Sequence, residues 1–203
     1  MNAVISHRLS WARLVSNLCS PPVVLAVLAW FAAQYDAQSP DEAYFLAGLF
    51  IVGAVLIPFG ILGWWVYRGT VSDLHMSLRH ERYWPLALEA ACTFVVWLLL
   101  PFVGHYPAMY LVTSYLLVET VMGLAVTYYW QISIHAGIMA GAVVIAGLLF
   151  GAEVGLALSP LILLVSAARL KLKKHTVGQV IAGIAIGVVA PPLLYVLIMP
   201  SGT

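Results

Sequence analysis

The chain has 203 residues, of which 63% are hydrophobic and 8% charged, with a formal net charge of +1. Soluble globular proteins carry roughly 25% charged residues, so this composition excludes a soluble domain and predicts an integral membrane protein. The nine Lys and Arg residues are too few for a nucleic-acid interface, and we expect no nucleic-acid partner.

The amino-terminal stretch 3–18 mixes apolar residues with Arg8 and Arg13. This mixture is typical of a short amphipathic helix that lies in the lipid headgroup layer. We therefore expect an interfacial helix within residues 1–18.

Apolar runs long enough to cross a bilayer follow this stretch, since a spanning helix needs about 20 mainly apolar residues. The pattern predicts an all-α integral membrane bundle of about six to seven spans, built as a single membrane domain over residues 1–203. The candidate spans are 19–35, 44–66, 84–103, 108–129, 132–151, 153–168 and 177–198.

Charge is distributed unevenly between the two ends of these spans. Every Lys and Arg falls before the first span, after the second or after the sixth, and an even number of crossings separates these three positions, so they share one side. The opposite side carries Asp36, Asp41, Glu42 and Glu153. The positive-inside rule then predicts that the basic side is cytoplasmic. We expect the membrane to be the inner (plasma) membrane of a bacterium or archaeon.

Three polar segments share this basic side. They are "SDLHMSLRHERYWP" at 72–85, "QISIHAG" at 131–137 and "SAARLKLKKHTVGQV" at 166–180. Two crossings separate each segment from the next, so we expect all three to meet at one membrane surface.

The residue types in these segments suit phosphate chemistry. Arginine binds phosphate oxygens bidentately, one histidine can attack phosphorus while a second protonates the leaving oxygen, and a helix start offers further donors. We predict that the phosphate is clamped by Arg79, Arg82 and Arg169. We predict that the histidine pair is His175 and His135 and that the hydroxyl donor is Ser133.

The spacing of these residues resembles that of the membrane branch of the type 2 phosphatidic acid phosphatase superfamily, to which vanadium haloperoxidases are related. That family carries Lys-x6-Arg-Pro, Pro-Ser-Gly-His and Ser-Arg-x5-His-x3-Asp. The matching positions are His75-x6-Arg82, Ser133-x-His135 and Arg169-x5-His175, within residues 70–190.

The resemblance implies a membrane phosphatase that acts on a lipid phosphate or a prenyl diphosphate and needs neither a metal nor another cofactor. It implies that His175 forms a phosphohistidine and that His135 is the general acid. Arg82 and Arg169, assisted by His75, would hold the phosphate.

Several positions depart from the family pattern. His75 stands where the family has lysine, Ile134 replaces a glycine and Ala168 replaces a serine. In the family, a carboxylate orients the nucleophilic histidine. Gln179 stands at that position here, and its side-chain carbonyl can accept an N–H but carries no charge. Loss of the corresponding carboxylate from an analogous triad costs about 10⁴-fold in rate.

These departures leave other functions open. In the main alternative the chain is an inactive phosphatase-like fold that binds lipid, as a homo-oligomer or as a structural subunit of a membrane complex. A transporter or a pigment-binding protein is the more remote alternative, suggested by histidines and acids inside spans.

Two acids lie within predicted spans. We expect Glu89 to pair with a clamp arginine, and Glu119 to be protonated and hydrogen-bonded to Thr93, Ser114 or a tyrosine. The small-x3-small pair Gly183 and Gly187 is expected to allow close helix packing, either within the chain or in a dimer.

Overall fold

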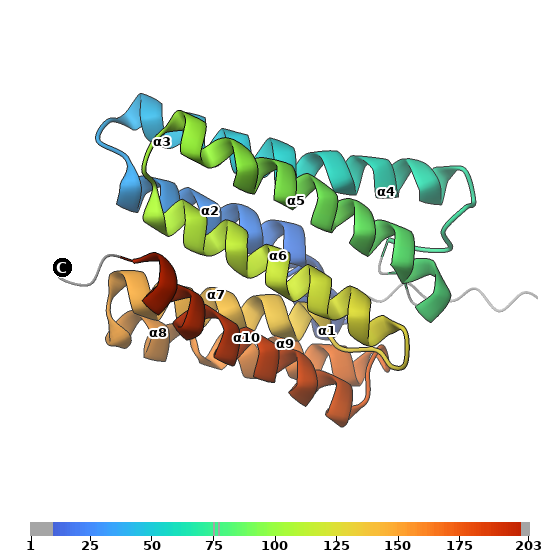
Figure 1. Ribbon diagram of the computed structural model, residues 1–203. Coiled ribbons are helices and arrows are strands. Elements are labelled where there is room, and N and C mark those ends of the chain that lie inside the picture. The colour runs from blue at the N-terminus through green and yellow to red at the C-terminus, as the bar shows by residue number, and fades with distance from the viewer. Residues whose placement is uncertain (1–9, 75, 77, 200–203) are drawn as a thin grey trace, which may run out of the picture.

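The computed structural model describes residues 10–74, 76 and 78–199, and every regular element among them is helical (Figure 1). The protein is an all-α integral membrane bundle, as the composition predicts. Its helices are α1 (Trp11–Leu18), α2 (Pro21–Asp36), α3 (Pro40–Phe50), α4 (Ile57–Tyr67), α5 (Tyr83–Val103), α6 (Pro107–Thr127), α7 (Ile134–Phe150), α8 (Ala152–Leu158), α9 (Pro160–Lys171) and α10 (Val177–Ile198).

Each apolar run of the sequence forms a helical segment, but these segments differ in length. Among the described residues, five of these helical segments are long and apolar enough to span a membrane, and α1 with α2, bent by 44°, make a sixth if they are counted as one span. The helix α7 is apolar but has only 17 residues, or roughly 25 Å at 1.5 Å per residue. The first and fifth predicted spans are therefore the short ones.

The second span is interrupted by a π-helical turn, η1 (Ile51–Leu56), between α3 and α4. Pro58 follows this turn at the start of α4. Because proline has no N–H and its ring clashes with the carbonyl four residues earlier, the regular α-helical ladder cannot pass through it. The apolar pattern gave no sign of this irregular turn.

The connections between helices gather at two ends of the bundle. At one end, the Asp36 carboxylate accepts hydrogen bonds from the N–H groups of Ala108 (3.1 Å) and Met109 (2.8 Å) at the start of α6. The Tyr106 hydroxyl donates to Glu42 nearby. These bonds fasten the α2–α3 connection to the α5–α6 connection.

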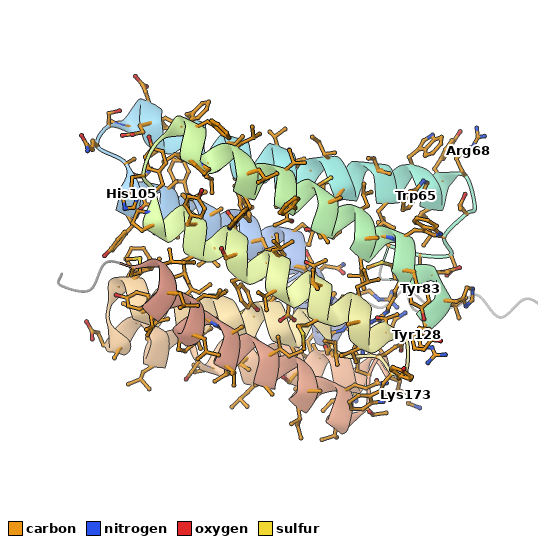
Figure 2. All side chains as sticks on the ribbon, in the orientation of Figure 1. Trp65, Arg68, Tyr83, His105, Tyr128 and Lys173 are labelled. Carbon is orange, nitrogen blue, oxygen red and sulfur yellow. The ribbon has the colours of Figure 1, made fainter. Side chains whose placement is uncertain are left out.

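The other end, which we call the basic end, carries the connections α4–α5, α6–α7 and α9–α10. Figure 2 shows Arg68, Tyr83, Tyr128 and Lys173 there, with His105 at the far end of the bundle. The three polar segments recognised in the sequence therefore share one end.

Close packing of α7 on α10 sets the distance between two of these segments. A side chain at Gly183 would meet the carbonyl oxygen of Ser133, and one at Gly187 would meet that of Gly137. The small-x3-small pair thus serves packing within the chain, with α10 lying against the backbone of α7.

The helix α1 packs on α9 as well as lying at the basic end. Its Ala12 and Ser16 are buried, whereas Trp11, Leu14 and Leu18 are exposed. The predicted amphipathic helix thus begins at Trp11 and uses its inner face to cover the bundle. Residues 1–9 lie outside the described part of the chain.

Candidate functional site

A cavity of about 480 Å³ lies at the basic end, inside the bundle. Its wall contains the guanidinium groups of Arg82 and Arg169 and the imidazoles of His135 and His175. These residues come from the start of α5, the end of α9, the start of α7 and the α9–α10 connection. Segments separated by two crossings thus contribute to one site.

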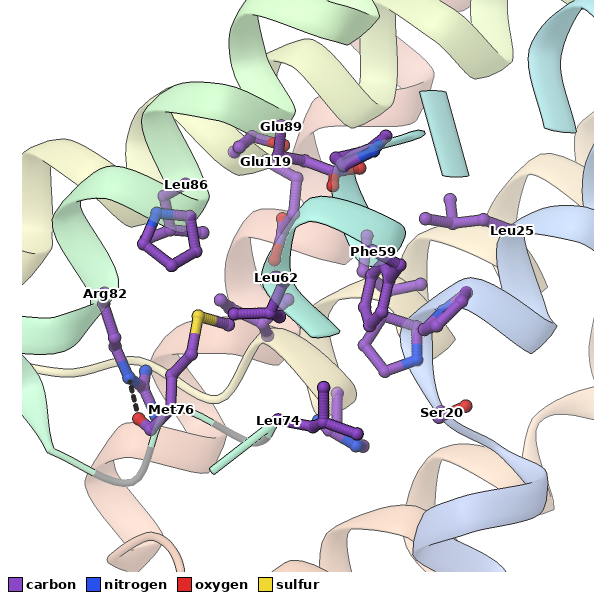
Figure 3. Close-up of a pocket in the computed structure, with 18 of the residues that line it drawn as sticks. Ser20, Leu25, Phe59, Leu62, Leu74, Met76, Arg82, Leu86, Glu89 and Glu119 are labelled. Atoms are coloured by element: carbon purple, nitrogen blue, oxygen red, sulfur yellow. Dashed lines mark hydrogen bonds between the residues drawn. The ribbon is translucent and has the colours of Figure 1, made fainter. Parts of the chain in front are cut away.

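Arg82 joins two of the connections. It ends the short helix η2 (Arg79–Arg82) and is 4% exposed. Its Nε donates to the Met76 carbonyl (2.9 Å, the dashed line in Figure 3) and its Nη1 donates to the Ile132 carbonyl (3.2 Å). A guanidinium has five N–H donors, so Arg82 can also bind an anion in the cavity while these two bonds hold it in place.

Arg169 lies in the last turn of α9 and is 2% exposed. Its Nη1 donates to the Ser16 hydroxyl (2.8 Å) on α1, and its Nε has no hydrogen-bond partner among the described residues. A buried charged donor without a partner is costly. An anion in the cavity would satisfy it.

His175 precedes the first turn of α10 and is buried next to both arginines. Burial, and then the positive charges of Arg169 and Arg82, lower the pKa of His175 to about 3, while a side-chain hydrogen bond with Gln179 acts in the opposite direction. The ring is therefore neutral at physiological pH, and its Nδ1 has no hydrogen-bond partner within the described residues. A neutral imidazole has the lone pair that a nucleophile needs.

Ser133 and Gln179 hold the two histidine-bearing segments together. The Ser133 N–H donates to the Gln179 carbonyl (3.0 Å), and the Ser133 hydroxyl caps α7 by accepting from the Ala136 N–H (3.4 Å). This cap lies two residues before His135, which is in the first turn of α7. Ser133 itself is fully buried and lies outside the cavity lining.

The Gln179 side chain has a second bond besides the one to His175. Gln179 and Thr176 form a reciprocal capping box at the start of α10: the side-chain Oε1 of Gln179 accepts from the Thr176 N–H (3.0 Å), and the backbone N–H of Gln179 donates to the Thr176 hydroxyl (3.4 Å). Glu or Gln at this position is the common choice for such a cap. Gln179 therefore serves as a helix cap in addition to its contact with His175.

The other predicted clamps lie differently. Arg79 is exposed, and its Nη1 donates to the carbonyls of Tyr128 (3.3 Å) and Tyr129 (2.9 Å), so it braces the α6–α7 connection and does not line the cavity. His75 lies outside the described residues. Asp73 is close enough for its negative charge to act on both Arg82 and Arg169.

Glu89 and Glu119 both line the cavity, deeper in the bundle than Arg82 (Figure 3). The predicted hydrogen bond from Glu119 to Thr93, Ser114 or a tyrosine is wrong. Both carboxyl oxygens of Glu119 lack a partner among the described residues. Ser114 instead accepts from the Trp97 indole (3.0 Å).

Sequence reasoning missed Ser16 as the partner of Arg169, because the two residues lie 153 positions apart. Within the described part of the chain, no group of three His, Cys, Asp or Glu side chains gathers as a metal site would. The polar end of the cavity combines two buried cations, one neutral imidazole and a second imidazole. Such a set can bind a small anion and transfer a group to nitrogen.

Comparison with known proteins adds no assignment, since no protein-family model, curated protein or solved structure matches this chain.

Proposed function

We propose that the chain is a membrane phosphatase that hydrolyses a lipid phosphate through a phosphohistidine on His175. The observation that carries this proposal is the shared cavity of Arg82, Arg169, His135 and His175 at the basic end. Two guanidiniums offer bidentate binding to phosphate oxygens, and a neutral buried imidazole lies beside them.

The reaction takes two steps. In the first, a ring nitrogen of His175 attacks phosphorus, the bond from phosphorus to the lipid oxygen breaks, and His135 gives a proton to that oxygen. In the second, His135 takes a proton from water, the resulting hydroxide attacks phosphorus, and the bond from phosphorus to nitrogen breaks. The products are a lipid alcohol and inorganic phosphate, and both histidines return to their starting states.

A lipid substrate is favoured by the rest of the cavity. Beyond the four polar groups its wall is largely apolar, with Leu25, Phe59, Leu62 and Leu116 among the lining side chains. A cavity of this volume falls within the roughly 300–1,000 Å³ range of small-molecule sites. The phosphate would then lie at the headgroup level while a hydrocarbon chain extends along the apolar wall.

The test is phosphate release by the purified full-length protein from long-chain lipid monophosphates in mixed micelles. We expect turnover in the wild type and in His105→Ala, which alters an exposed histidine at the opposite end. We expect none in His175→Ala. Equal turnover in His175→Ala and the wild type would end this assignment.

A non-catalytic lipid-binding role is the second candidate, favoured by the uncharged Gln179 beside His175. It predicts saturable binding of lipid phosphate with no phosphate release. Acid-labile, alkali-stable radiolabel that enters the wild type but not His175→Ala would demonstrate phosphohistidine and exclude this role.

A further inference from the structure

The cavity contains a pair of carboxyl groups that the proposed hydrolysis does not use. Glu89 on α5 and Glu119 on α6 both line it, together with Arg82, Arg169 and the two histidines (Figure 3). Neither acid takes part in the transfer steps described above.

Glu119 is a buried hydrogen-bond acceptor whose partner could be a ligand. It is 1% exposed, and neither carboxyl oxygen has a hydrogen-bond partner in the described portion of the chain. Buried polar groups are nearly always hydrogen-bonded, and each exception in a native protein needs an explanation. Glu119 is one of the residues that line the cavity, and a ligand bound there would supply one.

The fold makes space for this side chain. A Cβ at Gly137 on α7 would collide with the Glu119 carboxyl group, so only glycine at that position admits it. Gly137 lies two residues beyond His135, a rise of about 3 Å along α7. The Glu119 carboxyl group therefore meets α7 at nearly the same level along the helix axis as His135, although residues two positions apart do not share a helix face.

We propose that Glu119, with Glu89 beside the same cavity, forms a subsite for a hydrogen-bond donor on the lipid. The donor is a hydroxyl or an ammonium group on the lipid backbone close to the phosphoester oxygen, because Glu119, His135 and His175 line the same cavity. This subsite rests on the proposed function for its phosphate end. It narrows the substrate to amphiphiles with a polar backbone and disfavours simple prenyl phosphates, which carry no donor there.

Binding measured without turnover tests the subsite. The protein is His175→Asn, which cannot form the phospho-enzyme, and the probes are 1-octadecylglycerol 3-phosphate and its 2-O-methyl ether. A third probe, 2-aminooctadecyl phosphate, separates an ammonium donor from a hydroxyl donor. We expect at least one donor lipid to bind roughly tenfold more tightly than the methyl ether, as one hydrogen bond to a buried acceptor would give.

Glu119 is then substituted in the His175→Asn protein. Glu119→Leu should reduce the preference to about onefold, while Glu119→Gln, which keeps a carbonyl acceptor, should retain part of it. Because an unpaired buried carboxyl group is removed, Glu119→Leu is also expected to melt no lower than its parent. A preference that survives in Glu119→Leu, or is absent from the parent, overturns the proposal.

The two proposals fail separately. If the preference for donor lipids depends on Glu119 but the wild type releases no phosphate, the subsite is supported and the proposed hydrolysis is wrong. Hydrolysis of all three probes at equal efficiency would leave the phosphatase standing and remove the subsite.

Discussion

At the scale of single residues, the decisive group is His175, whose neutral state follows from its surroundings. Burial, together with the positive charges of Arg169, Arg82 and Lys174, lowers its pKa to about 3. A bound phosphate would offset the two guanidinium charges, which would make the developing positive charge on the ring less costly during transfer. The protein thus keeps the proposed nucleophile neutral, and the phosphate of the proposed substrate would supply the countercharge.

This shift of pKa makes stability depend on pH. Between pH 6.5 and 3 the unfolded chain binds a proton at His175 that the folded protein does not, so stability falls as the solution becomes more acidic through this window. We expect the apparent melting temperature of the solubilised wild type to fall more steeply from pH 6.5 to pH 4 than that of His175→Asn. Parallel curves for the two proteins would contradict a depressed pKa.

A substitution at Gln179, which contacts His175, is predicted to raise turnover, whereas most substitutions in a site lower it. Gln179→Glu keeps the capping box with Thr176, because Glu suits that position of the helix start. It also supplies a carboxylate that stabilises positive charge on the ring. We expect turnover to rise at least about tenfold, with about 10⁴-fold as the ceiling from analogous triads.

Steady-state phosphate release at pH 7 measures this effect. Gln179→Leu, which removes the acceptor, is the matched control and should lower turnover below that of the wild type. If Gln179→Glu leaves turnover unchanged, the side chain at this position acts only as a helix cap.

At the scale of elements, the contact between α7 and α10 positions the two histidines. Gly183→Ala would place a Cβ 2.5 Å from the Ser133 carbonyl oxygen, which is backbone and cannot move aside cheaply. We expect a loss of about 1–3 kcal/mol of stability, typical of overpacking, and a larger relative loss of activity because His135 and His175 would move apart.

The control for this change is Gly60→Ala on α4. A Cβ there meets nothing within 4 Å, so this variant should be neutral or more stable by up to about 1 kcal/mol. Thermal melting and phosphate release of both variants give the comparison. Equal behaviour of the two variants would show that the α7–α10 contact is not tight in solution.

At the scale of the whole molecule, the helices and their convergence could be predicted because both depend on simple counts. Apolar runs of about 20 residues define the spans, and the number of crossings places three polar segments at one end. Several interactions of single side chains could not be predicted. The contact of Ser16 with Arg169, the position of Arg79 on loop carbonyls and the unpaired Glu119 depend on helix rotation and on the 44° bend between α1 and α2.

The distribution of charge predicts how this bundle sits in its membrane. Basic residues gather at the end that holds the cavity, so the positive-inside rule predicts that this end faces the cytoplasm. With Cys19 and Cys92 replaced by serine, a cysteine at exposed Lys173 should resist a membrane-impermeant maleimide in intact cells and react after lysis. A cysteine at exposed His105, at the opposite end, should react in both. Labelling at position 173 in intact cells would place the cavity on the outer surface, where its lipid would come from the outer leaflet.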